Sequence, residues 1–165
     1  MSKIAIVYGS STGAAEAVAE KVKDALGGAK VFNADGLDVN DLKPFDFLVF
    51  GTSTTGVGDL QDDWEILLPK IEKLDFSGKK VALFGLGDSA SFSTSFASGM
   101  YHIYKALKGK AEIIGSVSTD GYTYDESDSV VDGRFVGLAL DEDNEYDQTD
   151  ARIEAWVEDL KKKIA

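Results

Sequence analysis

Residues 4–26 read IAIVYGSSTGAAEAVAEKVKDAL, and the order of the elements in this stretch decides the expected fold. The run Ile4–Tyr8 is continuously apolar rather than alternating, which is typical of a parallel strand covered on both faces. A loop of glycine and hydroxyl residues follows, and Ala14–Leu26 then places Val18 and Val22 on one stripe of a helix. The stretch therefore predicts a strand, a loop and a crossover helix, which is the repeating unit of a parallel α/β sheet.

The same alternation continues along most of the chain. Further strands are expected in the apolar runs Lys30–Phe32, Phe45–Phe50, Val81–Phe84 and Ala111–Ile114. Helical spacing of apolar residues predicts helices over Asp62–Leu74, Phe96–Leu107 and Asp150–Ile164, the last capped by Thr149 or Asp150. We expect one layered α/β domain over residues 1–165, with an insertion at about 116–140 that is long enough to carry strands of its own.

Composition excludes several classes of function. The chain has no cysteine and a single histidine, His102, which excludes disulfide scaffolds, iron–sulfur clusters, cysteine nucleophiles and sites that need two imidazoles. Lys and Arg number 17 and Asp and Glu 29, so the net charge is −12. Such a surface repels nucleic-acid phosphates and anionic lipids. No targeting segment or apolar run of membrane-spanning length is visible, so we expect a cytoplasmic monomer with no nucleic-acid partner, no membrane insertion and partners that present basic faces.

The loop after the first strand has the composition of a phosphate cradle. Residues 9–15 read GSSTGAA, so three hydroxyls precede the amino-terminus of a helix. Backbone N–H groups and the positive end of the helix dipole favour an anion there. No Lys follows the second glycine, so the loop is not a Walker motif, and the three-glycine spacing of a dinucleotide fingerprint is missing. A helix cap made of ordinary small polar residues is the alternative reading.

Two further loops should lie at the same edge of the sheet, because the carboxyl ends of parallel strands meet there. Residues 51–59, GTSTTGVGD, combine three glycines with four hydroxyls, and Gly56 adopts either sign of φ at low cost. Residues 85–92, GLGDSASF, offer close backbone approach to a ligand at Gly85 and Gly87 and a flat apolar side chain at Phe92. A flexible loop and a core aromatic are the plainer readings of these two segments.

Taken together, these segments resemble the flavodoxin family, and in particular its long-chain members. The likeness covers nearly the whole chain and is carried by residues 9–15, 85–88, 118–122, 133–141 and 142–144. In its acidity and short length, the chain is similar to cyanobacterial or cyanophage members of the family. The resemblance implies a flavodoxin-like three-layer sandwich with a five-stranded parallel sheet in the order 2-1-3-4-5, and FMN bound between the first and third strands. The long-chain insertion would lie near the last strand.

The resemblance also implies which residues hold FMN. The phosphate would be held by Ser10, Ser11, Thr12, Gly13, Ala14 and Ala15. One side of the ring would be lined by Ser53, Thr54, Thr55, Gly56, Val57 and Gly58, and the other by Leu86, Gly87, Asp88, Phe92 and Ser95, with Asp143 at the ribityl hydroxyls. No catalytic residue and no metal ligand is implied.

Four positions depart from the usual family pattern. Ala15 stands where a closing Thr is usual, and Thr55 stands where many relatives carry Trp. Phe92 replaces a stacking Tyr, and Ser95 replaces an amide near the pyrimidine edge. We expect each change to weaken FMN binding somewhat without removing the site.

The predicted function is that of a low-potential one-electron carrier that replaces ferredoxin. Our hypothesis is that the Gly56–Val57 peptide flips on reduction, so that the Gly56 carbonyl accepts a hydrogen bond from the proton at flavin N5 of the semiquinone. A second electron would add negative charge within an acidic protein, so the working couple is expected to be semiquinone/hydroquinone. Implied partners are ferredoxin-NADP reductase, photosystem I and other ferredoxin-dependent reductases.

Competing interpretations remain to be compared with this one. An FMN-dependent NAD(P)H:quinone or azo reductase is the alternative, although the three loops hold no basic residue for a nicotinamide phosphate. A phospho-receiver domain is discounted, because the sequence lacks the acidic pair after the first strand and the Lys after the fifth strand that such a domain needs. Residues 117–150 carry 11 acids and only Arg134 as a base, which indicates a solvated surface or steering toward basic partners. A calcium loop at residues 141–145 is rejected because Tyr146 stands where Gly is needed.

Overall fold

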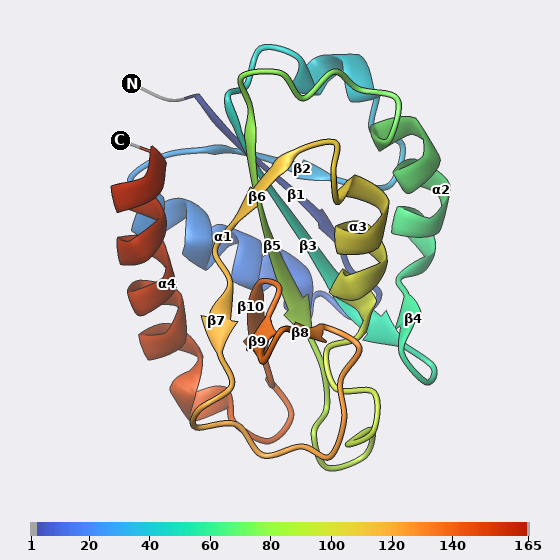
Figure 1. Cartoon of the computed structure of the whole chain (residues 1–165), viewed down its shortest axis with the longest axis vertical. Coiled ribbons are helices and arrows are strands. Elements are labelled where there is room, and N and C mark those ends of the chain that lie inside the picture. Colours follow the sequence, from blue (N-terminus) through green and yellow to red (C-terminus); the bar gives the residue numbers. More distant parts are fainter. Residues whose placement is uncertain (1–2, 165) are drawn as a thin grey trace.

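A parallel sheet forms the centre of the computed structural model, which describes residues 3–164 (Figure 1). Its strands lie in the order β2-β1-β3-β5-β10, and β6 also pairs with β5. The bounds are β1 Ile4–Gly9, β2 Lys30–Asn33, β3 Phe47–Thr55, β5 Lys80–Leu86, β6 Glu112–Ile114 and β10 Leu138–Leu140. Every pairing among these strands is parallel, so their carboxyl ends lie at one edge. The predicted order 2-1-3-4-5 is confirmed, with β6 and β10 together forming the fifth strand.

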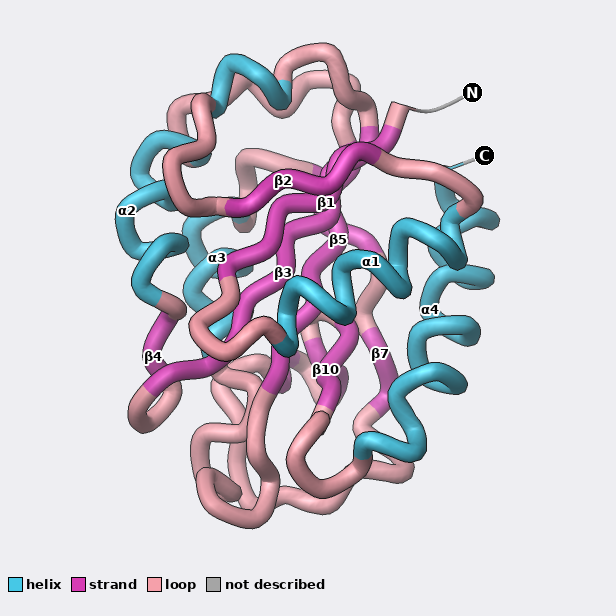
Figure 2. Tube along the Cα trace, turned by 180° about the vertical axis from the view of Figure 1, so that it is seen from behind, coloured by secondary structure: helices cyan, strands magenta, loops and turns pink. Residues whose placement is uncertain are grey.

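Helices cover both faces of this sheet, which confirms the predicted three-layer sandwich (Figures 1 and 2). One face carries α1 (Ala14–Leu26) and α4 (Thr149–Ile164), and the other carries α2 (Asp62–Ile71) and α3 (Gly99–Leu107). Successive residues of the inner strands β1, β3 and β5 point to opposite faces and are mostly buried on both, which is why these strands are largely apolar. In the part of the chain that the structure describes, no helix is both long and apolar enough to cross a membrane.

The last strand of the sheet is divided in two. β6 pairs with the beginning of β5, through Lys80 and Glu112, and β10 pairs with the end of β5, through Leu86 and Leu140. Residues 115–137 lie between these two pieces and form a small antiparallel sheet in the order β7-β9-β8. Its strands are β7 Val117–Ser118, β8 Val130–Val131 and β9 Arg134–Phe135. The insertion therefore begins and ends beside β5 and lies next to the carboxyl edge of the sheet (Figure 1).

Several boundaries differ from the expected ones. β3 continues to Thr55 instead of ending at Phe50, because Thr54 and Thr55 pair with a short antiparallel strand, β4 (Asp59–Leu60). The expected loop of residues 51–59 is thus a hairpin whose turn is residues 56–58. α3 begins at Gly99 rather than Phe96, since Ala97 has a φ of 51°, outside the helical region. Two 3-10 turns, η1 (Val39–Leu42) and η2 (Tyr146–Gln148), complete the chain.

Candidate functional site

A cavity of about 270 Å³ opens at the carboxyl edge of the sheet. Four segments meet around it: the loop after β1, the β3–β4 hairpin, the loop after β5 and the residues after β10. Its lining consists of Ser11, Thr12, Ala14, Ser53, Thr54, Thr55, Gly56, Leu86, Gly87, Asp88, Phe92, Ser95, Glu142 and Asp143. This is the place where an open α/β sheet binds its ligands, at the point where the strand order reverses between β1 and β3.

The loop after β1 leaves the amino-terminus of α1 open toward the cavity. Gly13 is the residue before the helix, has a φ of 92°, and provides no side-chain cap. Ser10 Oγ accepts a hydrogen bond of 2.8 Å from the Gly13 N–H, which closes the loop into a tight turn. Ser11 and Thr12 are exposed at the rim, so their hydroxyls and the first N–H groups of the helix remain available to an anion.

The β3–β4 hairpin forms one wall of the cavity. Thr54 Oγ1 accepts a hydrogen bond of 2.9 Å from the Gly99 N–H, which ties the hairpin to the start of α3. Gly56 opens the turn with a φ of 51°, and Val57 at its tip is 74% exposed. The wall therefore combines an anchored strand with a turn that projects into solvent.

The loop after β5 forms the opposite wall. Phe92 is 44% exposed and lines the cavity, so it is a boundary aromatic and not a core residue. A Cβ at Gly85 would lie 2.9 Å from Met100 Cγ, and one at Gly87 would lie 2.4 Å from the Ala97 backbone nitrogen. The prediction that these two glycines serve close approach to a ligand is therefore incomplete: both allow α3 and the segment before it to pack directly on the sheet.

Two buried hydroxyls in the cavity wall have no partner. Ser53 and Ser95 both line the cavity, and neither Oγ atom makes a hydrogen bond within the described chain. An unpaired buried hydroxyl costs roughly 1–3 kcal/mol, so such groups are uncommon unless something binds them. The cavity is thus suited to a ligand with a polar-edged flat body and an anionic end.

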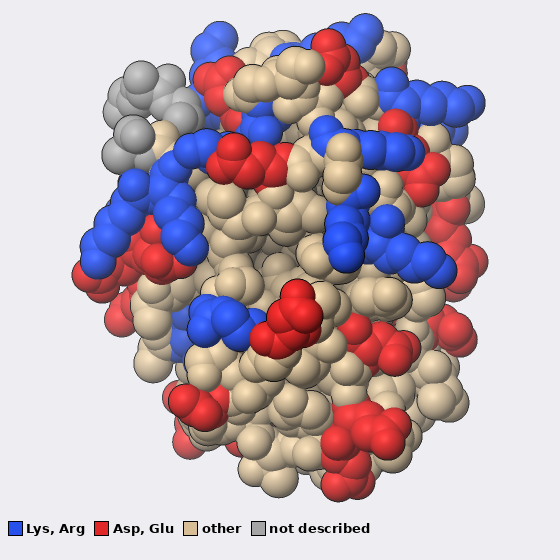
Figure 3. Space-filling model, viewed as in Figure 1, with Lys and Arg blue, Asp and Glu red and all other residues tan. Residues whose placement is uncertain are grey.

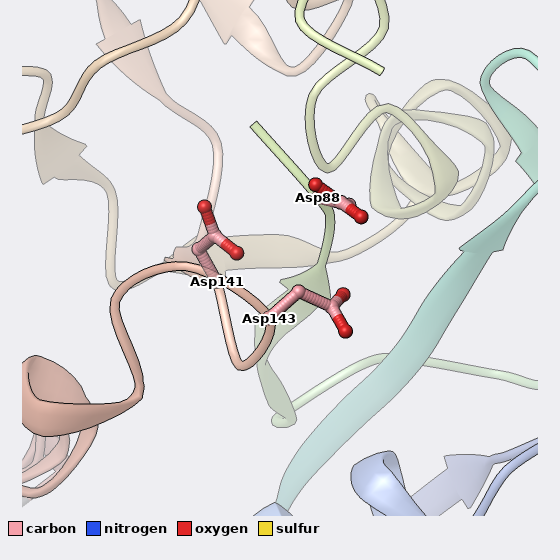
Figure 4. A group of neighbouring side chains, drawn as sticks. All are labelled: Asp88, Asp141 and Asp143. Carbon is pink, nitrogen blue, oxygen red and sulfur yellow. The ribbon is translucent and has the colours of Figure 1, made fainter. Parts of the chain in front are cut away.

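Three carboxylates, Asp88, Asp141 and Asp143, lie at the rim between the β5 and β10 loops (Figure 4). Asp141 is fully buried and is compensated by hydrogen bonds from Ser89 and from both nitrogens of Asn144, at 3.2, 3.0 and 3.1 Å for the Ser89 N–H, the Asn144 N–H and Asn144 Nδ2. Asn144 Nδ2 also donates to Asp88 Oδ1 at 2.8 Å, so it joins the two loops. Asp88 and Asp141 are therefore held by protein donors.

The pKa values of two carboxyl groups of this rim, Asp88 and Asp143, are shifted in opposite directions. Hydrogen bonds from the Ser91 backbone N–H and from Asn144 lower the pKa of Asp88 below its ordinary value. Burial, followed by the nearby charges of Asp88 and Asp141, raises the pKa of Asp143. The folded structure therefore stabilises the charged form of Asp88 and disfavours that of Asp143.

Most of the predicted site residues come together around the cavity, and five do not line it. Ser10 and Gly13 close the loop through their hydrogen bond, and Ala15 is fully buried. Val57 points into solvent, and Gly58 is buried beneath the turn. Sequence reasoning named Asp143 but not its neighbour Glu142, whose position depends on where the chain returns after β10.

Aromatic and histidine side chains outside the cavity hold backbone carbonyls in place. Trp64 is fully buried, and its indole nitrogen donates to the Gly51 carbonyl at 2.8 Å. Trp156 does the same for the Gly115 carbonyl, also at 2.8 Å. His102 is half-buried and hydrogen-bonded to the Gly58 carbonyl.

Comparisons with known proteins agree with this geometry. The family model described as flavodoxin matches residues 6–156. The flavodoxin of Helicobacter pylori is 42% identical over 165 residues, covering the whole of both chains, and that of Synechocystis is 39% identical over 165 residues, covering 98% of this chain and 97% of the relative. The crystal structure of Fusobacterium nucleatum flavodoxin bound to flavin mononucleotide has a TM-score of 0.92 at 35% identity and covers 99% of each chain.

Proposed function

Since the chain belongs to the flavodoxin family, we propose that its cavity at the carboxyl edge of the sheet binds FMN and that the protein is an electron carrier without a substrate of its own. The observation that carries this proposal is the pair of unpartnered hydroxyls, Ser53 Oγ and Ser95 Oγ, inside a cavity that ends at an uncapped helix amino-terminus. These groups match the polar ring edge and the phosphate of FMN.

The phosphate end of FMN would be held by the residues of the loop after β1, Ser10, Ser11, Thr12, Gly13, Ala14 and Ala15. The donors are the N–H groups at the start of α1 and the hydroxyls of Ser11 and Thr12, and the loop contains no positively charged side chain. Ala15 cannot add a hydroxyl, and its methyl group packs in the core. Binding would therefore depend on backbone donors more than on side chains.

The ring would lie between the two walls. Residues 53–58 line one side and Leu86, Gly87, Asp88, Phe92 and Ser95 the other, with Asp143 near the ribityl chain. Phe92 presents an exposed aromatic face on which a flat ring stacks. Thr55 occupies the hairpin side and leaves that face with less aromatic cover.

FMN, when bound, supplies the one-electron chemistry, and the chain adjusts the free energy of each step. The Gly56 carbonyl would turn to accept a hydrogen bond from the N–H that the ring gains with the first electron. Gly56 already has a φ of 51°, a conformation that costs glycine little. The chain thereby favours the first step.

The second electron meets an acidic surrounding. Asp88, Glu142 and Asp143 line the cavity, and no Lys, Arg or His is found among its described lining residues. Added negative charge on the ring is opposed by these carboxylates. We therefore infer that the second step has the lower potential and is the one used to reduce partner proteins.

Partners are proposed to be basic-faced redox proteins, such as ferredoxin-NADP reductase, photosystem I or other ferredoxin-dependent reductases, met by the monomer in the cytoplasm. Charge is unevenly distributed: Lys and Arg gather in the upper part of the face in Figure 3, and Asp and Glu predominate in the lower part, toward the cavity. Lys79, Lys80 and Lys161–Lys163 lie at the far end of the sheet. This polarity would turn the cavity toward a positive surface.

Reductive titration of the purified protein tests the proposal. The apoprotein should bind FMN with quenching of its fluorescence, and photoreduction should proceed in two resolved one-electron steps. With FMN bound, it should mediate electron flow from NADPH through an added ferredoxin-NADP reductase to cytochrome c. Failure to retain FMN would refute the proposal. NAD(P)H oxidation with a quinone but no added reductase would instead support the reductase alternative, which the relatives do not favour.

A further inference from the structure

His102 lies outside the cavity but contacts the turn that borders it. It belongs to α3, and its Nε2 lies 2.8 Å from the carbonyl oxygen of Gly58. A carbonyl oxygen only accepts hydrogen bonds, so Nε2 carries the proton and donates. A side chain of α3 is thus joined to the backbone of the β3–β4 turn.

The turn itself has one fixed end and one loose end. Gly58 is buried with a φ of 85°, and a Cβ there would lie 3.3 Å from the Cβ atoms of both Ser95 and Ser98. Val57, in contrast, is 74% exposed, and a Cβ at Gly56 would meet only the Asp59 carboxylate, at 2.8 Å. Packing and the His102 hydrogen bond therefore hold the turn at Gly58 and leave the Gly56–Val57 peptide able to rotate.

We propose that His102 is a positioning residue that confines rotation of the turn to the Gly56–Val57 peptide. The inference rests on the proposed function, in which the Gly56 carbonyl turns toward the ring after the first electron. Rotating one peptide plane changes the torsion angles on both of its sides. With Gly58 held by His102, this change stops at Val57, so the turn has two defined arrangements instead of a disordered set.

Hydrogen exchange of the cofactor-free protein tests the restraint without any contribution from FMN. In His102→Ala, we expect the amides of residues 56–59 to exchange about three- to tenfold faster, which corresponds to the loss of one net hydrogen bond. His102→Gln keeps an N–H donor and should restore most of the protection. Lys105→Ala is the matched control, because Lys105 lies on the same helix and lines the same groove between α2 and α3 without bonding the turn.

The FMN-loaded protein provides the second readout. The hydrogen bond to the ring would form only when the ring takes up one electron and a proton from water, so the cost of ordering a loose turn would fall on that step. A three- to tenfold change in the equilibrium corresponds to about 30–60 mV, at 59 mV per tenfold for one electron. The first one-electron midpoint potential should therefore drop by this amount in His102→Ala and recover in His102→Gln.

Three results would overturn the inference. These are turn amides that exchange at the wild-type rate in His102→Ala, no recovery in His102→Gln, or faster exchange with an unchanged potential, which would leave His102 as a structural brace only. Circular dichroism verifies that each variant is folded. A wild-type protein that fails to bind FMN would refute the proposed function instead, and the exchange result would still stand.

Discussion

Replacing Gly56 by Ala is the most direct test of how the chain adjusts its first electron step. Gly56 has a φ of 51°, and a β-carbon in this left-handed region costs roughly 1–2 kcal/mol. The added Cβ would also lie 2.8 Å from Asp59 Oδ2, but that carboxylate ends a flexible side chain and can move away. Backbone strain is therefore the main cost of the substitution.

The change in the first midpoint potential is set by the smaller of two free energies: that of the hydrogen bond to the ring and that of the strain that the β-carbon adds to the rotated turn. A hydrogen bond from the ring to the Gly56 carbonyl is worth about 0.5–1.5 kcal/mol net. Strain at a φ of 51° is already present before the peptide rotates, so the potential falls only by the further cost that the β-carbon adds to the rotated arrangement, up to the full value of the hydrogen bond. Since about 1.4 kcal/mol corresponds to about 59 mV for one electron, Gly56→Ala should lower the first midpoint potential by about 20–60 mV.

Spectroelectrochemical titration of the FMN-loaded variants measures this shift. Gly78→Ala is the control, because Gly78 has a φ of 75° with no atom within 4 Å of its added Cβ, and it precedes β5 at the opposite end of the sheet. Both variants should lose similar stability in urea unfolding, but only Gly56→Ala should change the potential. An unchanged first potential in Gly56→Ala would show that the turn does not stabilise the reduced ring.

Three further variants test other parts of the site. Ser95→Ala removes an unpartnered buried hydroxyl, so the apoprotein should become about 1 kcal/mol more stable in urea while the dissociation constant for FMN, measured by fluorescence quenching, rises about two- to tenfold. The raised pKa of Asp143 means that its charged form is disfavoured in the folded state; Asp143→Asn should therefore stabilise the apoprotein by less than about 1 kcal/mol at neutral pH, and urea titrations should show the gain vanish in acid, where the wild-type group is protonated. Ser129→Ala leaves the buried Ala97 carbonyl without the 2.7 Å hydrogen bond from Ser129 Oγ and should cost about 1–3 kcal/mol by urea unfolding, whereas a cost near zero would mean that the insertion does not brace this segment.

Elements with a strong apolar period were predictable from the sequence. The bounds of α1 agree with the expected range, and α4 begins one residue early, at Thr149. The spacing of apolar residues along each helix shows which face is buried, and this pattern can be detected within a short stretch of sequence. The β3–β4 hairpin was not predicted, because Thr54 and Thr55 pair with Leu60 and Asp59, and three of these four residues are polar, in a pattern that resembles a loop.

Contacts made between distant parts of the chain were the least predictable. A Cβ at Gly51 would lie 1.9 Å from the Phe84 ring, so this glycine is required by packing between neighbouring strands. The divided fifth strand and the place of Glu142 follow from where the insertion returns to β5. None of these features leaves a local signal, whereas the composition of the loops was sufficient to identify the cavity's position.

The site combines backbone groups that are fixed in position with one peptide that can rotate. Groups that already point at a ligand need no reorganisation when charge develops on it, which favours donors built on strand ends and helix termini. The N–H groups at the start of α1, left uncapped by any side chain, are of this kind. The Gly56–Val57 peptide is the exception, since it is exposed on one side and held at Gly58 on the other. Movement limited to one peptide lets the protein respond to the charge of its ligand while the rest of the cavity stays fixed, which explains why His102 and not a cavity residue is placed at that limit.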